Sequence, residues 1–161
     1  MVAGGRKATR EVGGISSQQL RYMDILLVSP WKVGLGRDIG YPFDALKHVQ
    51  VANPANFLAQ EILIQGERDP KDRAKEILYV HDTIEAISGN LEEMREIFAN
   101  QIRSHLHPKR VRELTSAADV LFGSVNDMIR ESALMATGRK LSAEVMIERC
   151  RAGLKRIFVQ T

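Results

Sequence analysis

The chain has 161 residues, which is about the length of one domain. Apolar residues make up 44% of it and charged residues 27%, a balance that excludes wholesale disorder and collagen-like repeats. With a formal net charge of +3, no apolar run near the roughly 18 residues of a membrane span, and no signal-like N-terminus, the chain is expected to be soluble and cytoplasmic.

The N-terminal third of the chain predicts short strands. Residues 1–19 are rich in Gly, Ser and Gln and predict a flexible entry with at most one irregular strand. Residues 20–28 form an abrupt apolar run that ends at a Ser-Pro breaker and predicts a strand. A short strand from Lys32 to Leu35 and another over residues 48–51 are also predicted. We therefore expect a small sheet of two to three strands within residues 20–52.

From Asn53 onward the pattern becomes helical. Asn is a favoured N-cap and Pro54 suits the first helical turn. Similar start and stop signals then recur, and they predict five to six helices over residues 53–160. The helix starts expected after the first lie at Asp69-Pro70, Ser88-Gly89-Asn90, Pro108, Val125 and Ser142. The connections are short, which favours antiparallel neighbours in a compact bundle. Residues 20–161 are therefore expected to form a single α+β domain.

The charge is distributed unevenly along the chain. Residues 51–100 carry five basic and ten acidic side chains, whereas residues 101–161 carry eleven basic and six acidic ones. A basic C-terminal region is one signature of nucleic-acid binding, which makes residues 103–156 a candidate surface for it. The other interpretations are the solvated faces of amphipathic helices and pairing with the acidic segment. Aromatic side chains for base stacking are scarce there, since only Phe122 and Phe158 follow residue 100.

Asp24 is the carboxylate that interrupts the apolar run of residues 20–28. A buried ionised acid is costly unless it is paired or functional, so an inward-facing Asp24 is a candidate catalytic residue. Strand alternation gives the other interpretation, in which Met23 and Ile25 face the core and Asp24 faces solvent. The sequence alone leaves both open.

A dense run of charged residues covers positions 67–75, at the junction between two predicted helices. Acids at a helix start followed by bases are typical of an ordinary solvated helix. The alternative is a polar cluster that faces a ligand, because helix N-terminal amides and cations gather there. In that interpretation the candidate ligand-binding residues are Arg68, Lys71, Asp72 and Lys75.

Other motifs argue against familiar kinds of site. His105 and His107 would point in different directions on a helix, where we expect them near a C-terminus. No His-x-x-x-His or Cys-x-x-Cys spacing occurs, so no metal site is expected. Glycines within residues 34–40 do not match the spacing of a dinucleotide fingerprint. His81 and Cys150 are expected to be interior packing residues.

Three stretches carry a resemblance to a known family. These are Tyr22-Met23-Asp24-Ile25-Leu26-Leu27, Val49-Gln50-Val51-Ala52-Asn53-Pro54-Ala55-Asn56-Phe57 and Arg68-Asp69-Pro70-Lys71-Asp72-Arg73-Ala74-Lys75. In this order they resemble the back half of bacterial nucleotidyltransferase-fold proteins, the group with abortive-infection and type IV toxin–antitoxin members. The resemblance covers about residues 20–105. It implies an acid-bearing strand, a hairpin strand, a proline-led helix and then a helix rich in Arg, Lys and Asp.

The catalytic signature of that family is incomplete in this chain. The family has a Gly-Ser turn, an Asp-x-Asp pair and a third acid, and these carboxylates hold the Mg²⁺ that bridges the nucleoside triphosphate. Residues 13–17 are similar to the turn, but no acid pair follows before Tyr22, and Asp-x-Asp occurs nowhere in the chain. Asp24 matches the third acid alone. Where relatives have a lysine, the chain reads Ala59-Gln60-Glu61.

The resemblance therefore predicts a truncated or degenerate nucleotidyltransferase-like protein without catalysis. Such a protein would bind a partner protein or a nucleotide, in a bacterial defence or toxin–antitoxin system. One alternative is an active enzyme, completed by another chain and using Mg²⁺ and a nucleoside triphosphate. Another is a helical protein that binds nucleic acid through residues 103–156. Because a small sheet leaves unpaired edges, we expect a homo-oligomer or a stable complex with a protein partner.

Overall fold

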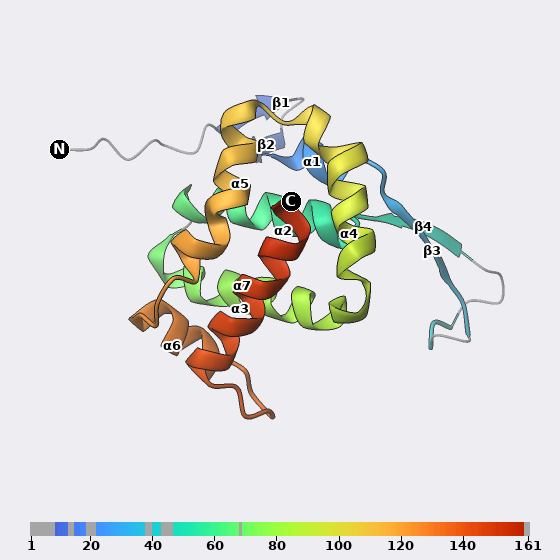
Figure 1. The fold of residues 1–161 in the computed structure, drawn as a ribbon. Helices are drawn as coiled ribbons and strands as arrows, with labels where there is room; N and C mark the ends of the chain where they lie inside the picture. The colour runs from blue at the N-terminus through green and yellow to red at the C-terminus, as the bar shows by residue number, and fades with distance from the viewer. Residues whose placement is uncertain are drawn as a thin grey trace.

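The computed structural model describes residues 9–12, 15–18, 22–37, 40–42, 47–67 and 69–159. Over these residues the chain forms two separate two-stranded antiparallel sheets and a bundle of helices (Figure 1). The predicted α+β fold, with short N-terminal strands followed by a helical bundle, is therefore confirmed. Within this described part, no helix has the length and apolar character that crossing a membrane requires.

Six α-helices follow the strands in the described residues, in agreement with the five to six expected. They are α2 (Pro54–Ile64), α3 (Pro70–Ala86), α4 (Leu91–Ile97), α5 (Pro108–Leu121), α6 (Asp127–Leu134) and α7 (Ala143–Phe158). Shorter helical segments join them: the 3₁₀ turns η2 (Gln65–Glu67), η3 (Ser88–Asn90) and η5 (Arg103–His105), and the π-helix η4 (Phe98–Ile102).

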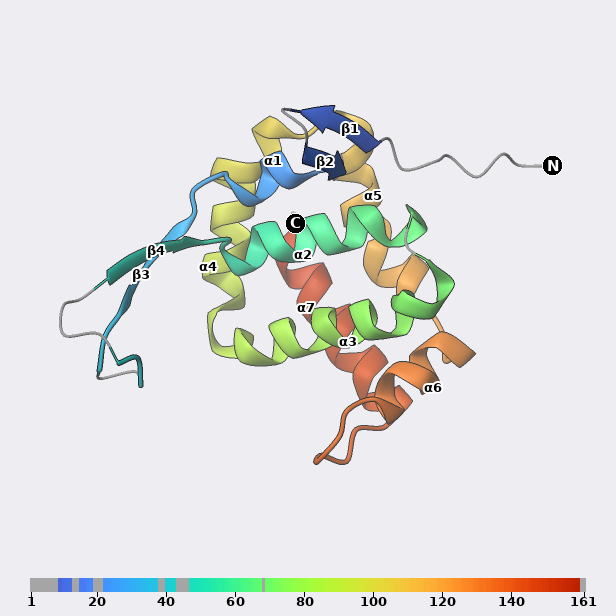
Figure 2. The same ribbon diagram turned by 180° about the vertical axis from the view of Figure 1, so that it is seen from behind.

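Helix α2 lies at the centre of the molecule. Nine of its eleven residues are buried, because α1, α3, α4 and α5 all pack against it. Figure 2 shows α2 and α3 side by side on one face, with α4 and α5 at opposite ends. A helix surrounded in this way can be apolar on nearly every side.

Helix α7 covers the other face of the core and packs against α3, α4, α5 and α6 (Figure 1). Its buried residues recur at helical spacing, and they are Met146, Cys150, Gly153, Leu154, Ile157 and Phe158. The ring of Phe158 meets Phe98 edge-on, with 4.8 Å between centroids. These contacts join α7 and η4 into the core that α2 and α3 form.

Three predicted helix starts are confirmed by capping hydrogen bonds. The side chains of Asn53, Asp69 and Ser142 accept from backbone amides two or three residues later, at 2.9, 3.2 and 3.2 Å respectively. The helix start predicted at Ser88-Gly89-Asn90 is also found, since Asn90 is the residue before α4, but the Asn90 side chain makes no capping hydrogen bond. The chain passes through η3 there, and this turn connects α3 directly to α4.

The strands are paired differently from the single sheet that was expected. Strands β1 (Thr9–Val12) and β2 (Ile15–Gln18) form a hairpin where at most one irregular strand was predicted. The signal for it is the Gly-Gly pair between them, which is typical of a two-residue hairpin connection. The strands predicted near residues 32 and 48 are confirmed as β3 (Trp31–Leu35) and β4 (Lys47–Val51), which pair with each other. The rest of the predicted flexible entry lies outside the described residues.

The predicted strand over residues 20–28 is wrong. Its described part contains a four-residue helix, α1 (Met23–Leu26), preceded by Tyr22 in the left-handed region with φ of 60°. Ile25 is buried against α2, so one turn of helix buries the apolar side chain at the middle of this run without a strand partner. Residues 20 and 21 lie outside the described part. Tertiary packing decides the conformation of such short apolar runs.

Two buried asparagines fix the path of the chain after α1. The Asn53 side-chain amide donates to the Ser29 carbonyl at 3.0 Å, and that of Asn56 donates to the Val28 carbonyl. Both asparagines are fully buried. The start of α2 therefore binds the turn that follows α1, and it holds the root of the β3–β4 ribbon in place.

Candidate functional site

The described part of the predicted ligand-binding cluster lies in the first turns of α3. Lys71 and Lys75 are exposed and four residues apart, so they occupy one face of the helix. Asp72 is half-buried beside them, and its amide donates to the Asp69 carbonyl at 2.9 Å. Arg68 lies outside the described residues. The structure therefore places Lys71 and Lys75 on one face of α3, and the Lys71 ammonium also lies 3.7 Å from the Asp69 carboxylate.

The same face continues to Tyr79, one helical turn beyond Lys75. The ammonium nitrogen of Lys75 lies 5.7 Å from the centroid of the Tyr79 ring, within the range of a cation–π contact. The Tyr79 side chain remains 44% exposed. Residues 71, 75 and 79 thus form one stripe, which we call the α3 stripe.

An open pocket of about 480 Å³ adjoins the α3 stripe. It lies where the start of α2 meets the second half of α3, and its lining residues are Pro54, Phe57, Tyr79, Asp82, Thr83, Ala86 and Ile87. Most of these side chains are apolar, which is usual for small-molecule sites of this size. The Thr83 hydroxyl is already occupied, because it donates to the Tyr79 carbonyl at 2.8 Å. Tyr79 belongs to both the α3 stripe and this pocket.

Asp82 forms the charged edge of the pocket. Its Oδ1 lies 3.0 Å from Nδ1 of His81 and accepts a hydrogen bond from Arg139. Partial burial acts to raise the pKa of Asp82, but the hydrogen bonds and charges of His81 and Arg139 outweigh it, so the pKa falls below its ordinary value. His81 is 1% exposed, as predicted for an interior histidine, and its Nε2 lies 3.4 Å from Glu85. Asp82 is therefore committed to holding α3 against the segment before α7.

Asp24 is placed apart from the α3 stripe. It is exposed on α1, and α2 lies between α1 and α3 in both views (Figures 1 and 2). In the part of the chain that the structure describes, no three or more His, Cys, Asp or Glu side chains form a group able to hold a metal ion. The described residues therefore do not fit the Mg²⁺ that the resemblance implies for catalysis.

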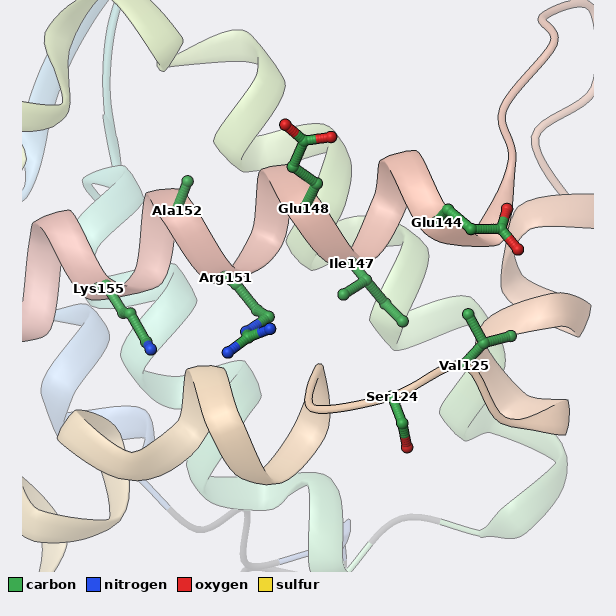
Figure 3. A pocket seen from close by; sticks show the side chains of 8 residues that line it. All are labelled: Ser124, Val125, Glu144, Ile147, Glu148, Arg151, Ala152 and Lys155. Atoms are coloured by element: carbon green, nitrogen blue, oxygen red, sulfur yellow. The ribbon is translucent and has the colours of Figure 1, made fainter.

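A second pocket, of about 490 Å³, lies on the outer face of α7 (Figure 3). Arg151 and Lys155 line one side of it, but both are held by Asp119 of α5, at 3.1 and 2.9 Å. The pocket also contains Glu144 and Glu148, whose carboxylates disfavour an anionic ligand. All its lining residues lie within the candidate nucleic-acid surface of residues 103–156, but none belongs to the predicted ligand-binding residues or to the α3 stripe. Because its cations are already paired, we do not take it as the functional site.

Ion pairs join the basic C-terminal region of the chain to its acidic middle. Arg139, Arg149 and Arg156, from the basic C-terminal region, pair with Asp82, Glu85 and Glu92 of the acidic middle. This agrees with the interpretation that the basic region pairs with the acidic segment. Cys150 is buried, and burial, with the nearby charges of Asp82 and Glu85, raises the pKa of its thiol, which fits the predicted packing role.

A family model described as nucleotidyltransferase matches residues 3–100. The chain belongs to this family. No curated protein and no solved structure matches it. The match confirms the nucleotidyltransferase-like character expected from the three resembling stretches, and its span includes the whole α3 stripe and the pocket beside it.

The sequence indicated only part of this site. The charge run predicted Lys71 and Lys75, but Phe57 and Tyr79 were not singled out as site residues. The available signal was spacing, since residues 71, 75 and 79 recur every four positions. The pocket itself had no local signal, because it exists only where α2 and α3 meet.

Proposed function

We propose that this nucleotidyltransferase-family chain has no transfer activity of its own and binds a nucleotide on α3. The observation that carries the proposal is the continuity of the α3 stripe with the pocket. In this arrangement the base occupies the pocket against Phe57 and Tyr79, and the phosphates extend toward Lys75 and Lys71. Aromatic side chains stack on bases, and ammonium groups pair with phosphate charge.

The number and placement of the acidic residues support the proposed absence of catalysis. Transfer of a nucleotidyl group needs several carboxylates to hold Mg²⁺, and the chain contains no Asp-x-Asp pair. Asp24, which matches the third acid of the family, is exposed on a helix rather than set in a sheet. A setting in bacterial defence or a toxin–antitoxin system belongs to the same proposal and rests on the resemblance alone. A cytoplasmic location is also part of the proposal, and it rests on the apolar runs of the sequence being shorter than a membrane span.

Calorimetry with each nucleoside triphosphate tests the binding proposal. We expect Lys75→Gln to weaken binding by about tenfold, because one phosphate contact is lost, and Tyr79→Ala to weaken it by at least as much. Lys109→Gln is the matched control, since Lys109 is also an exposed lysine and lies at the start of α5. Absence of nucleotide binding, or equal losses in the control, would contradict the α3 site.

A transfer assay tests the absence of catalysis. The protein is incubated with Mg²⁺ and each labelled nucleotide, and incorporation into itself, tRNA or protein is measured. We expect no turnover above background. Turnover that disappears in Asp24→Ala would instead support the alternative of an active enzyme.

A partner protein is the second candidate ligand, and it is favoured by the ribbon of β3 and β4. Figures 1 and 2 show this ribbon extending away from the helical bundle. The third candidate, a nucleic acid bound by residues 103–156, is less favoured, because many cations of that region are held in ion pairs.

A further inference from the structure

The β3–β4 ribbon carries an apolar face, and none of the described helices makes extensive contact with the ribbon. Its strands pair Trp31 with Val51 and Val33 with Val49, so these four side chains share one face with Leu35. The ribbon makes its main contacts between its own two strands, not with any helix. Trp31 and Val51 are each 39% exposed at its root. A lone two-stranded ribbon is marginal in water, and it gains stability when further strands pair with its edges.

Both outer edges of the ribbon are unpaired in the described residues, because each strand has a single partner. Natural proteins usually protect such edges with charges, proline or a covering element. Strand β3 has one charged residue, Lys32, and it lies on the polar face with His48 and Gln50. The β3 edge is therefore open to another strand.

We propose that β3 pairs antiparallel with β3 of a second copy of this chain, about a two-fold axis at Val33. Trp31 then lies opposite the partner's Leu35, and the two apolar faces join into one across four strands. Lys32 lies opposite the partner's Gly34, so no like charges face each other. A self-complementary patch of this kind is what a two-fold interface requires.

The charge pattern selects β3 over β4 for this contact. The same two-fold pairing of β4 about Val49 would set Lys47, which shares the apolar face, against the partner's Val51. That arrangement places a charge at the contact between the two copies, whereas pairing through β3 leaves Lys47 on an outer strand. Strand β3 offers three apolar residues on the same face and no charge among them, and so it is the edge that fits a second copy.

Light scattering on the full chain over a range of concentrations tests the dimer. We expect the wild-type chain to dimerise and Val33→Lys to raise the dissociation constant by about tenfold or more, because two like charges then face each other at the axis. Val49→Lys is the matched control: the residue pairs with Val33 across the ribbon and is also half-buried, but it lies on the other strand. We expect it to keep most of the dimer.

A charge-swap experiment tests the register itself. Neither Val33→Lys nor Val33→Glu should dimerise well alone, but an equimolar mixture should recover the dimer, because unlike charges meet at the axis. Circular dichroism of each variant checks that the helical bundle remains folded. A monomeric wild type, a mixture that fails to recover, or a dimer broken by Val49→Lys and unaffected at Val33 would overturn the proposal.

The dimer and the nucleotide site can fail separately. The α3 stripe has no residue on the ribbon, so calorimetry on monomeric Val33→Lys should give the same nucleotide affinity as the wild type. A strand donated by a different protein would leave the isolated chain monomeric, and that outcome also contradicts self-pairing.

Discussion

Gly153 shows how closely two helices of the core approach each other. It is buried on α7, and a Cβ atom added there would lie 2.5 Å from Cγ2 of Ile84 on α3. Atoms of side chains do not come so close, and the branched side chain of Ile84 is itself 3% exposed, with little room to move. The absence of a side chain at Gly153 therefore sets the distance between α7 and α3.

Gly153→Ala is expected to lower the free energy of unfolding by about 1–3 kcal/mol, because the added methyl group overpacks the core. Urea denaturation measures the change. Gly89→Ala is the control, since a Cβ at Gly89 meets no atom within 4 Å. If both variants lose the same stability, a general effect of replacing glycine, and not the contact with Ile84, would explain the loss.

The ion pair between Asp82 of α3 and Arg139, in the segment before α7, should make the stability of the fold depend on pH. That pKa is lowered in the folded chain despite partial burial, because His81 and Arg139 hydrogen-bond to the carboxylate. A lowered folded pKa contributes stability above the ordinary value of 3.8, and this contribution is lost as the pH falls through the folded value.

Asp82→Asn should therefore cost stability at pH 7 and much less at pH 3. We expect a difference below about 1 kcal/mol at pH 7, because the pair is partly exposed and screened by solvent. Urea denaturation at the two pH values measures it. Glu93→Gln, at an exposed position of α4, should have a stability cost that does not decrease between pH 7 and pH 3. A cost for Asp82→Asn that stays constant down to pH 3 would show that the charge of Asp82 does not stabilise the fold.

At the scale of elements, local sequence signals were sufficient to predict most helices of the bundle but not the structure of the N-terminal part. The starts of α2, α3 and α7 were predictable, because each cap bonds an amide within three residues. Helix α1 was not predictable, because Asn53 and Asn56, more than twenty residues away, hold the turn after it. Long-range contacts of this kind have no pattern in a single sequence.

The candidate site likewise has one part with a local sequence signal and another that depends on long-range packing. Lys71 and Lys75 belong to a continuous charge run, which the sequence displays directly. The pocket requires Phe57 of α2 to meet Tyr79 of α3, and only packing brings these residues together. The partners of the basic C-terminal residues also lie on other helices, so pairing with the acidic segment was only one of several interpretations before the structure was known.

For the whole molecule, the distribution of ion pairs decides how strongly this basic protein would bind a polyanion. The sequence pI is about 9.2, yet Arg151 and Lys155 both contact Asp119. The hydrogen bond from Lys155, followed by that from Arg151, holds the pKa of Asp119 below its ordinary range. Asp119 therefore remains charged at neutral pH and neutralises part of the surface that residues 103–156 would offer to nucleic acid.

Asp119→Asn should free both cations and increase retention on a heparin column, whereas the wild-type chain should elute at low salt. Glu93→Gln makes the same change in net charge at a position that contacts neither cation, and it should shift elution less. The difference arises because freed neighbouring cations act together on one polyanion, while a distant charge changes only the overall field. Equal shifts in the two variants would mean that net charge alone governs polyanion binding and that the pairing at Asp119 does not suppress it.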